Sequence, residues 1–96
     1  MRTRDTSYKD YQLNNDDVNN ILLFCRQNTT ESNNILFKCA FESNASIGAD
    51  LFYSLSQDVS YERLDAIKSV SYPKNDFYGY RRKCIALIYQ AVCTKK

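Results

Sequence analysis

The stretch NDFYGYRRKCIALIYQ, residues 75–90, has the apolar spacing of a long helix. At about 100° of rotation per residue, Phe77, Cys84 and Ile88 fall on one face. The buried stripe predicted from this spacing is Phe77, Cys84, Leu87, Ile88 and Ala91. We predict that this helix begins at position 75 or 76 and runs to about position 93.

The opposite face of this predicted helix is polar and aromatic. By the same angular reading it carries Tyr78, Gly79, Arg82, Lys83, Ala86, Tyr89 and Gln90. A glycine inside a helix lowers stability by about 0.5–1 kcal/mol relative to alanine. Gly79 therefore has two interpretations. Either it lets a DNA groove or another helix approach the backbone closely, or it is an exposed position at which the cost is tolerated.

Four shorter helices are expected before this one, each after residues that commonly cap a helix. The capping residues are Asn14–Asp17, Thr30, Ser46 and Ser60, and apolar residues follow each at helical spacing. Two glycines and one proline are too few for the turns of an all-β fold. The predicted fold is therefore all-α, a compact bundle of four to five short helices that ends in a helix-turn-helix-like pair.

The length of 96 residues predicts a single domain over residues 1–96. Within it, residues 60–93 form the helix-turn-helix-like unit. Residues 1–13 are polar and charged without a period, which predicts a flexible arm. Two interpretations of Arg2 and Arg4 stay open, a contact with a DNA groove and simple disorder.

The charges are unevenly distributed along the chain. Residues 1–67 carry six cations and ten anions, whereas residues 68–96 carry seven cations and one anion, Asp76. A split of this kind is typical of proteins that meet a nucleic acid or a membrane surface. The basic end is therefore where we expect a polyanion to bind.

Several kinds of chemistry have no residues to perform them. The chain has no histidine, which removes the usual general base and the commonest zinc ligand. The four cysteines, at positions 25, 39, 84 and 93, form no C-x-x-C pair, and two glycines cannot build a phosphate-binding loop. We predict that the protein is not an enzyme and has no catalytic residue, no metal site and no cofactor.

Neither a secretory signal nor a membrane span is predicted. The N-terminus MRTRDTSYKDYQ has no apolar stretch, and no window approaches the length of apolar sequence that crosses a bilayer. We therefore expect a cytoplasmic protein with no membrane partner, whose cysteines are free thiols.

The run Arg81–Lys83 lies near the start of the last predicted helix, with tyrosines beside it. Recognition helices of DNA-binding modules reach base edges from their N-terminal part. Arginine donates two parallel hydrogen bonds to guanine edges or phosphates, and tyrosine hydroxyls commonly contact phosphate oxygens. The run is consistent with DNA binding, although solvated basic runs are also common on surface helices.

The segment SYERLDAIKSVSYPKNDFYGYRRKCIALI, residues 60–88, resembles the helix-turn-helix of sigma-factor region 4. It is closer still to small phage and mobile-element transcription regulators with a region-4-like end. Ser60 and Leu64 match the start of the first helix, and Phe77 matches the aromatic residue that opens the second. The turn departs from the pattern, because it is longer and has Ser69 where glycine is common.

The resemblance implies that residues 75–83 enter the major groove of double-stranded DNA. Tyr78, Arg82 and Lys83 would face the bases, and Lys74 and Arg81 would lie near phosphates. The predicted nucleic-acid-binding residues are Lys74, Asn75, Tyr78, Gly79, Arg81, Arg82 and Lys83. The earlier helices would support this unit or contact RNA polymerase, and a homodimer would suit two half-sites.

The first hypothesis is therefore a small DNA-binding transcription regulator of phage or mobile-element type. An alternative is a phage-encoded, protein-binding inhibitor of the anti-CRISPR type, which would act on a host nucleic-acid enzyme. Its acidic surface would be drawn from Asp16, Asp17, Glu31, Glu42, Asp50, Asp58, Glu62 and Asp65. A third is a structural helical module whose basic end is merely solvated.

Overall fold

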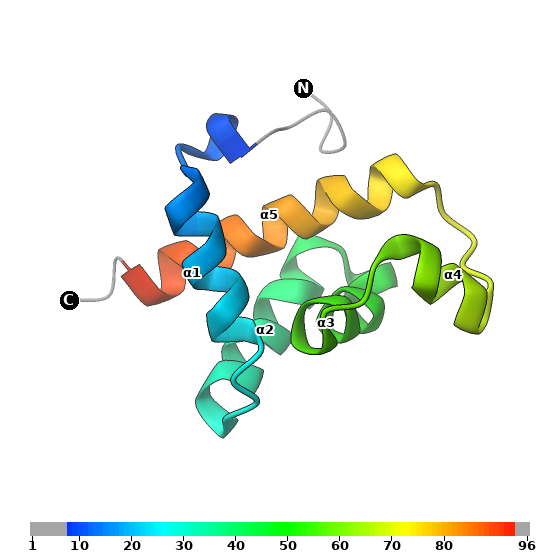
Figure 1. Cartoon of the computed structure of the whole chain (residues 1–96), viewed down its shortest axis with the longest axis horizontal. Coiled ribbons are helices and arrows are strands. Elements are labelled where there is room, and N and C mark those ends of the chain that lie inside the picture. Colours follow the sequence, from blue (N-terminus) through cyan, green and yellow to red (C-terminus); the bar gives the residue numbers. More distant parts are fainter. Residues whose placement is uncertain (1–7, 94–96) are drawn as a thin grey trace.

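The helices follow one another with short connections, as Figure 1 shows for the computed structural model, which describes residues 8–93. A 3-10 turn, η2, comes first and is followed by five α-helices, with a second 3-10 turn, η3, before the third. The elements are η2 Tyr8–Tyr11, α1 Asn15–Cys25, α2 Thr30–Ser43, η3 Ala45–Ile47, α3 Gly48–Gln57, α4 Tyr61–Lys68 and α5 Lys74–Cys93. No strand occurs in the described part of the chain, so the all-α prediction is confirmed.

Capping side chains explain where the first helices begin. The Asn14 side chain accepts from the Asp17 backbone N–H at 2.8 Å, and the Asp17 carboxylate accepts from the Asn14 backbone N–H at 3.1 Å. This reciprocal pair satisfies two of the N–H groups that a helix start leaves without partners. Thr29 and Ser32 form the same box at the start of α2, so Thr29 caps this helix and the prediction of Thr30 was wrong by one residue.

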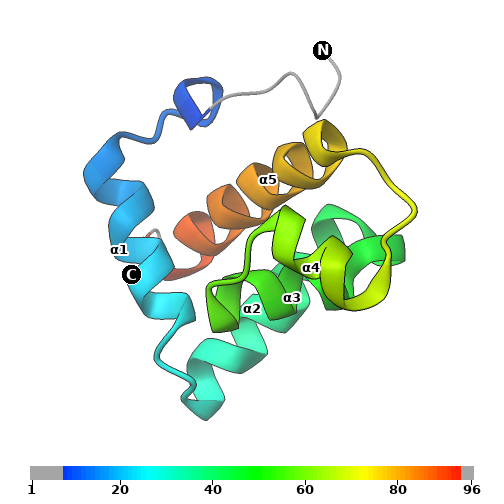
Figure 2. The same ribbon diagram turned by 45° about the vertical axis from the view of Figure 1, so that its right-hand side comes forward.

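The helix α5 is the central element against which the others pack. Figures 1 and 2 agree that α1 lies beside its C-terminal half and α4 near its N-terminal half. Contacts with α5 come from α2 above all, and also from α1, α3, α4 and η2. The predicted stripe holds at Phe77, Cys84 and Ile88, which are fully buried, but fails at Ala91, which is exposed.

The predicted outward face of this helix is partly wrong. Gly79 and Ala86 are both buried, and Ile85 is fully buried. A helical wheel assumes one buried side, whereas α5 is packed by helices from several directions. The backbone at Gly79 is therefore not open to a partner, and a DNA groove or a second helix cannot approach it directly.

The predicted arm extends too far along the chain. Residues 8–11 form η2, which packs on α5, and the Leu13 backbone N–H donates to the Tyr8 carbonyl at 3.0 Å. Leu13 itself is buried in the core. Residues 8–13 therefore belong to the folded part, while the rest of the predicted arm lies outside the described residues.

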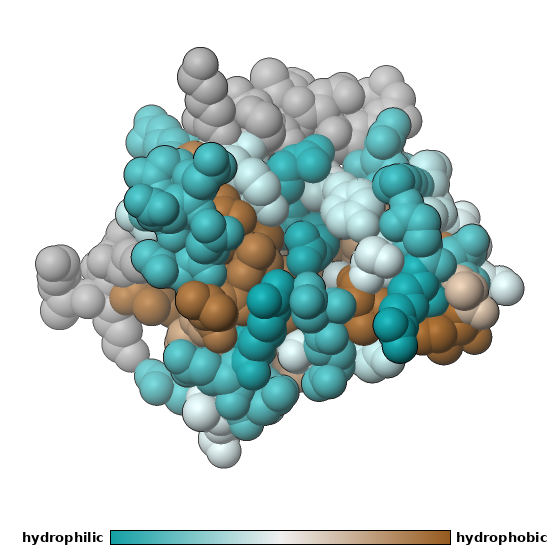
Figure 3. All heavy atoms as spheres, viewed as in Figure 1, coloured by the Kyte–Doolittle hydropathy of each residue, from teal (hydrophilic) through white to brown (hydrophobic). Residues whose placement is uncertain are grey.

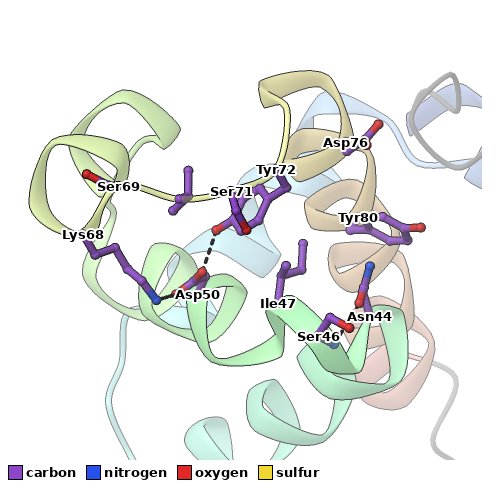
Figure 4. A pocket seen from close by; sticks show the side chains of 11 residues that line it. Asn44, Ser46, Ile47, Asp50, Lys68, Ser69, Ser71, Tyr72, Asp76 and Tyr80 are labelled. Carbon is purple, nitrogen blue, oxygen red and sulfur yellow. Dashed lines mark hydrogen bonds and ion pairs between the residues drawn. The ribbon is translucent and has the colours of Figure 1, made fainter.

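The connection between α4 and α5 is stabilised by the backbone conformation of Ser69 and by two contacts with Asp50. Ser69 takes the left-handed conformation, with φ of 52°, that glycine usually supplies at a helix end. In Figure 4, Asp50 of α3 accepts from the Tyr72 hydroxyl at 2.6 Å and from the Lys68 ammonium at 2.7 Å. Burial and the neighbouring carboxylate raise the pKa of Tyr72, so its hydroxyl stays protonated and keeps donating. These contacts fix α4 and the start of α5 against α3.

Candidate nucleic-acid interface

Tyr78 joins the start of α4 to α5. Its hydroxyl oxygen accepts from the Tyr61 backbone N–H at 3.0 Å, which is one of the N–H groups that lack a partner within α4. Its ring meets Phe77 edge-on, with the centroids 5.1 Å apart. Because the bond to Tyr61 uses the oxygen as acceptor, the hydroxyl proton of Tyr78 can still donate to an anion.

Arg81 lies one turn further along α5 and is half-buried. Its Nε donates to the Ser54 hydroxyl at 3.2 Å, and its guanidinium carbon lies 5.9 Å from the centre of the Tyr78 ring. Ser54 is itself held, because its hydroxyl donates to the Val59 carbonyl at 2.6 Å. The Ser54 hydroxyl and the Tyr78 ring thereby orient the guanidinium, and the bond to Ser54 uses Nε and not the terminal N–H groups.

The ion pairing of Arg81 differs from that of three other cations. Arg26 pairs with Asp58 at 2.9 Å, Lys68 pairs with Asp50 at 2.7 Å, and Lys74 pairs with Glu62. Among the residues that the structure describes, no carboxylate forms an ion pair with Arg81. A half-buried charge without a counter-ion is a group that an incoming anion would stabilise.

A hollow of about 200 Å³ opens beside this arginine. Its lining is Asp58, Val59, Ser60, Tyr78 and Arg81. Ser60 caps α4, with its hydroxyl accepting from the Arg63 backbone N–H at 3.2 Å, so the positive end of the α4 dipole faces this region. The one carboxylate in the lining, Asp58, forms an ion pair with Arg26 at 2.9 Å, which offsets part of its negative charge. The hollow therefore presents donors and positive potential to an anion.

The remaining predicted residues divide into two groups. Lys74 and Asn75 are exposed in the first turn of α5. The pair with Glu62 raises the pKa of Lys74, but both side chains are exposed, so the pair adds little to stability. Arg82 and Lys83 are half-buried. The structure thus brings Tyr78 and Arg81 together, sets Lys74 and Asn75 at the tip of α5, and removes Gly79 from the surface.

Two residues that shape this site, Ser54 beside Arg81 and Ser60 in the lining of the hollow, were missed by sequence reasoning, and both come from outside α5. Ser54 lies 27 positions before Arg81, on another helix, and carries no local signal of its role. Ser60 was identified only as a helix cap. Tyr8 is a third neighbour, because the charges of Arg81 and Arg82 act on its hydroxyl, whose pKa is raised by burial. A pattern read along one helix cannot find such contacts.

The buried thiols offer no reactive group near this region. Burial raises the pKa of Cys25 to about 12 and that of Cys39 to about 11, so both thiols are protonated at neutral pH. A protonated thiol is a poor nucleophile and a poor metal ligand. Within residues 8–93, no three histidine, cysteine, aspartate or glutamate side chains gather where they could hold a metal ion.

The acidic surface of the alternative hypothesis loses one of its members. Asp50 is buried and bound by Tyr72 and Lys68, so it cannot face a partner. Asp58 and Glu62 are engaged in ion pairs, whereas Asp16, Glu31 and Glu42 are exposed. Figure 3 shows that hydrophilic residues cover much of one face, with hydrophobic residues visible between them.

Two further findings bear on the class of protein. No helix in the described part of the chain combines the length and the apolar character needed to span a bilayer. No protein-family model, curated protein or solved structure matches the chain.

Proposed function

We propose that the protein binds double-stranded DNA, and that a backbone phosphate sits in the hollow beside Arg81. The observation that carries this proposal is the guanidinium of Arg81, which is half-buried and oriented by Ser54 and Tyr78 but paired with no carboxylate among the described residues. Charge-assisted hydrogen bonds from arginine to phosphate are about twice as strong as neutral ones. A phosphate in this position would supply the counter-ion that the fold leaves out.

In the proposed complex, the terminal N–H groups of Arg81 and the hydroxyl of Tyr78 donate to the phosphate oxygens. The exposed side chains of Lys74 and Asn75 then lie where the tip of α5 meets the groove. Because Gly79 is buried, the helix presents its tip to the duplex rather than its flank. Arg82 and Lys83 add to the local positive potential, which steers the encounter.

The role in transcription is part of the proposal and rests on the resemblance of residues 60–88 to sigma-factor region 4. A cytoplasmic regulator of phage or mobile-element type would use α4 and α5 on DNA. The helices α1 to α3 would support that unit or contact RNA polymerase. The tether from Asp50 to Tyr72 and Lys68 favours this division, because it fixes the DNA-facing pair against the rest of the fold.

The test is fluorescence anisotropy of the protein with a labelled random-sequence duplex at several salt concentrations. We expect binding that weakens steeply with salt, since the log–log slope follows the number of phosphates neutralised. Arg81→Gln should weaken binding by at least about tenfold, because hydrogen bonds to charged groups contribute about 1.5–3 kcal/mol. The matched control is Asn20→Asp, at an exposed position on α1, which lowers the net charge by the same amount and should bind as the unmodified protein does.

Absence of binding at low salt would contradict the proposal. So would an Arg81→Gln variant that is fully folded by circular dichroism and binds like the Asn20→Asp control.

A second candidate function, a protein-binding inhibitor of a host nucleic-acid enzyme, is favoured by the exposed carboxylates. Asp16, Glu31 and Glu42 lie on α1 and α2, away from the start of α5. An acidic surface of this kind would suit a partner with a basic nucleic-acid channel. Loss of activity in Asp16→Lys with Glu31→Lys, while Arg81→Gln stays active, would support inhibition over DNA binding.

A further inference from the structure

An aromatic patch lies on the surface formed by α2 and α3. Phe37 and Phe41 of α2 have ring centroids 4.6 Å apart, and Phe52 of α3 meets Phe37 edge-on at 5.9 Å. Phe37 is 55% exposed although it is wholly apolar. Tyr53, which follows Phe52 on α3, is also exposed. Aromatic side chains gathered on a surface in this way are typical of a protein–protein contact.

The patch is built into the fold and is not a loose group of side chains. A Cβ atom on Gly48 would lie 2.6 Å from the Phe41 ring, so only glycine lets this ring rest on the α3 backbone. Gly48 itself has ordinary helical geometry, with φ of −57° and ψ of −41°, and its backbone conformation does not require glycine. The glycine therefore serves the seating of Phe41, which in turn supports Phe37.

Two opposite charges lie beside the patch, on the flank of α2 that is turned towards α5. Lys38 and Glu42 are exposed and one helical turn apart. Lysine before glutamate is the less favourable order for an ion pair within a helix, and neither residue forms an ion pair with any described residue. Neither charge is neutralised by an ion pair with a described residue, and their sum is zero.

We propose that this patch binds a second copy of the same chain, with the two α2 helices antiparallel about a two-fold axis. Most soluble homo-oligomers are two-fold dimers, in which each surface meets its own copy. A two-fold axis at right angles to α2, near Cys39 and Ala40, keeps the charged flanks of the two helices on the same side. Lys38 then faces the partner's Glu42, and Glu42 faces the partner's Lys38.

The charges of Lys38 and Glu42 favour an antiparallel dimer over a parallel dimer and over a strongly charged partner. In the antiparallel dimer, each flank brings opposite charges together, and the aromatic rings of Phe37 and Phe41 interleave with those of the partner. A parallel arrangement would set the two charged flanks on opposite sides and leave all four charges unpaired. A strongly charged partner of either sign would meet a patch of zero net charge and gain nothing from it.

The experiment is sedimentation velocity without DNA, over protein concentrations from about 1 μM to about 1 mM. We expect a monomer–dimer equilibrium in this range. Phe37→Asp should weaken the dimer by at least about tenfold, because it places a charge in the centre of the contact. The control is Leu23→Asp, which introduces the same charge at a leucine that is 61% exposed on α1 and should leave the dimer unchanged.

Charge reversal tests the antiparallel arrangement itself. Lys38→Glu and Glu42→Lys should each weaken the dimer, because like charges then face each other across the contact. The double variant should restore it. A protein that stays monomeric at every concentration, or a Phe37→Asp variant that dimerises normally, would overturn the proposal. Failure of the double variant to recover would overturn the antiparallel arrangement. None of these results depends on whether the protein binds DNA.

Discussion

Lys74 and Arg81 lie about two turns apart on the same helix, yet their surroundings differ in each respect that governs anion binding. Lys74 is exposed and already paired with Glu62. Arg81 is half-buried, oriented by Ser54 and Tyr78, and has no ion-pair partner among the described residues. The more exposed cation, Lys74, is thus the one that already forms an ion pair. Under the proposed function, exposure alone therefore does not identify the residue that binds the phosphate.

Phe77→Ala should have the largest effect, because it removes the ring that packs α4, the connection after it and the start of α5 together. Phe77 is fully buried, and its ring contacts those of Tyr61, Tyr72 and Tyr78. We expect the free energy of unfolding in urea to fall by about 3–5 kcal/mol. Ile67→Ala, at an exposed position on α4, should stay within about 0.5 kcal/mol. Equal effects from the two would show that Phe77 is not part of the core.

Asp50→Ala should come next, because it leaves two donors without their acceptor. The carboxylate binds the Tyr72 hydroxyl and the Lys68 ammonium, which fix the connection before α5. We expect a loss of about 1–3 kcal/mol in the free energy of unfolding. Asn19→Ala, at an exposed position on α1, is the control. If the two variants were equally stable, the connection would be held by other contacts.

Ser69→Gly should have a smaller effect and the opposite sign. Ser69 has φ of 52°, and the left-handed conformation costs a residue with a side chain about 1–2 kcal/mol. Glycine removes this cost but loses about 0.5–1 kcal/mol through its more flexible unfolded chain. The free energy of unfolding should therefore rise by up to about 1.5 kcal/mol. A clear loss of stability would mean that the serine side chain contributes to the turn.

The pair between Lys74 and Glu62 should show the smallest effect, as a weak dependence of stability on pH. The ion pair lowers the pKa of Glu62 below its ordinary 4.5 and raises that of Lys74 above its ordinary 10.5. Its contribution is therefore present between these two values. It is lost as the pH falls through the lowered pKa of Glu62 or rises through the raised pKa of Lys74.

Urea unfolding of Glu62→Gln, followed across the acid limb, checks this dependence. The variant should lose the part of the acid sensitivity that comes from the pair, and the difference should shrink at high salt. A large difference in the free energy of unfolding between the variant and the unmodified protein would contradict the view that this ion pair is solvent-exposed and weak.

The helices and the middle of the core could be predicted from the sequence, because capping and spacing are local properties. Phe77, Cys84 and Ile88 were identified from periodicity alone, and Ser60 was identified as a cap. For the site, the sequence indicated only the segment of the chain, residues 74–83, and not the contacts that shape it. Its geometry depends on contacts such as that of Arg81 with Ser54, 27 positions away, and no local pattern encodes them.

The error at Gly79 has a related cause. A wheel drawn for one helix has one buried side, but α5 is packed by α1, α2, α3, α4 and η2. The left-handed conformation of Ser69 has a different cause, because it is supported locally by the Asp65 side chain, which accepts from the Val70 backbone N–H at 3.1 Å. Packing by other helices thus decides the burial of Gly79, whereas a side-chain contact at the helix end supports a conformation that serine rarely adopts.

The central claim is that Arg81, and not the more exposed Lys74, is the main phosphate contact. The most direct test compares Arg81→Gln with Lys74→Gln in salt-dependent anisotropy with a labelled duplex. We predict that Arg81→Gln loses at least about tenfold in affinity and lowers the log–log salt slope by about 1, while Lys74→Gln changes the affinity much less. Equal losses in the two variants, or a larger loss in Lys74→Gln, would contradict the claim.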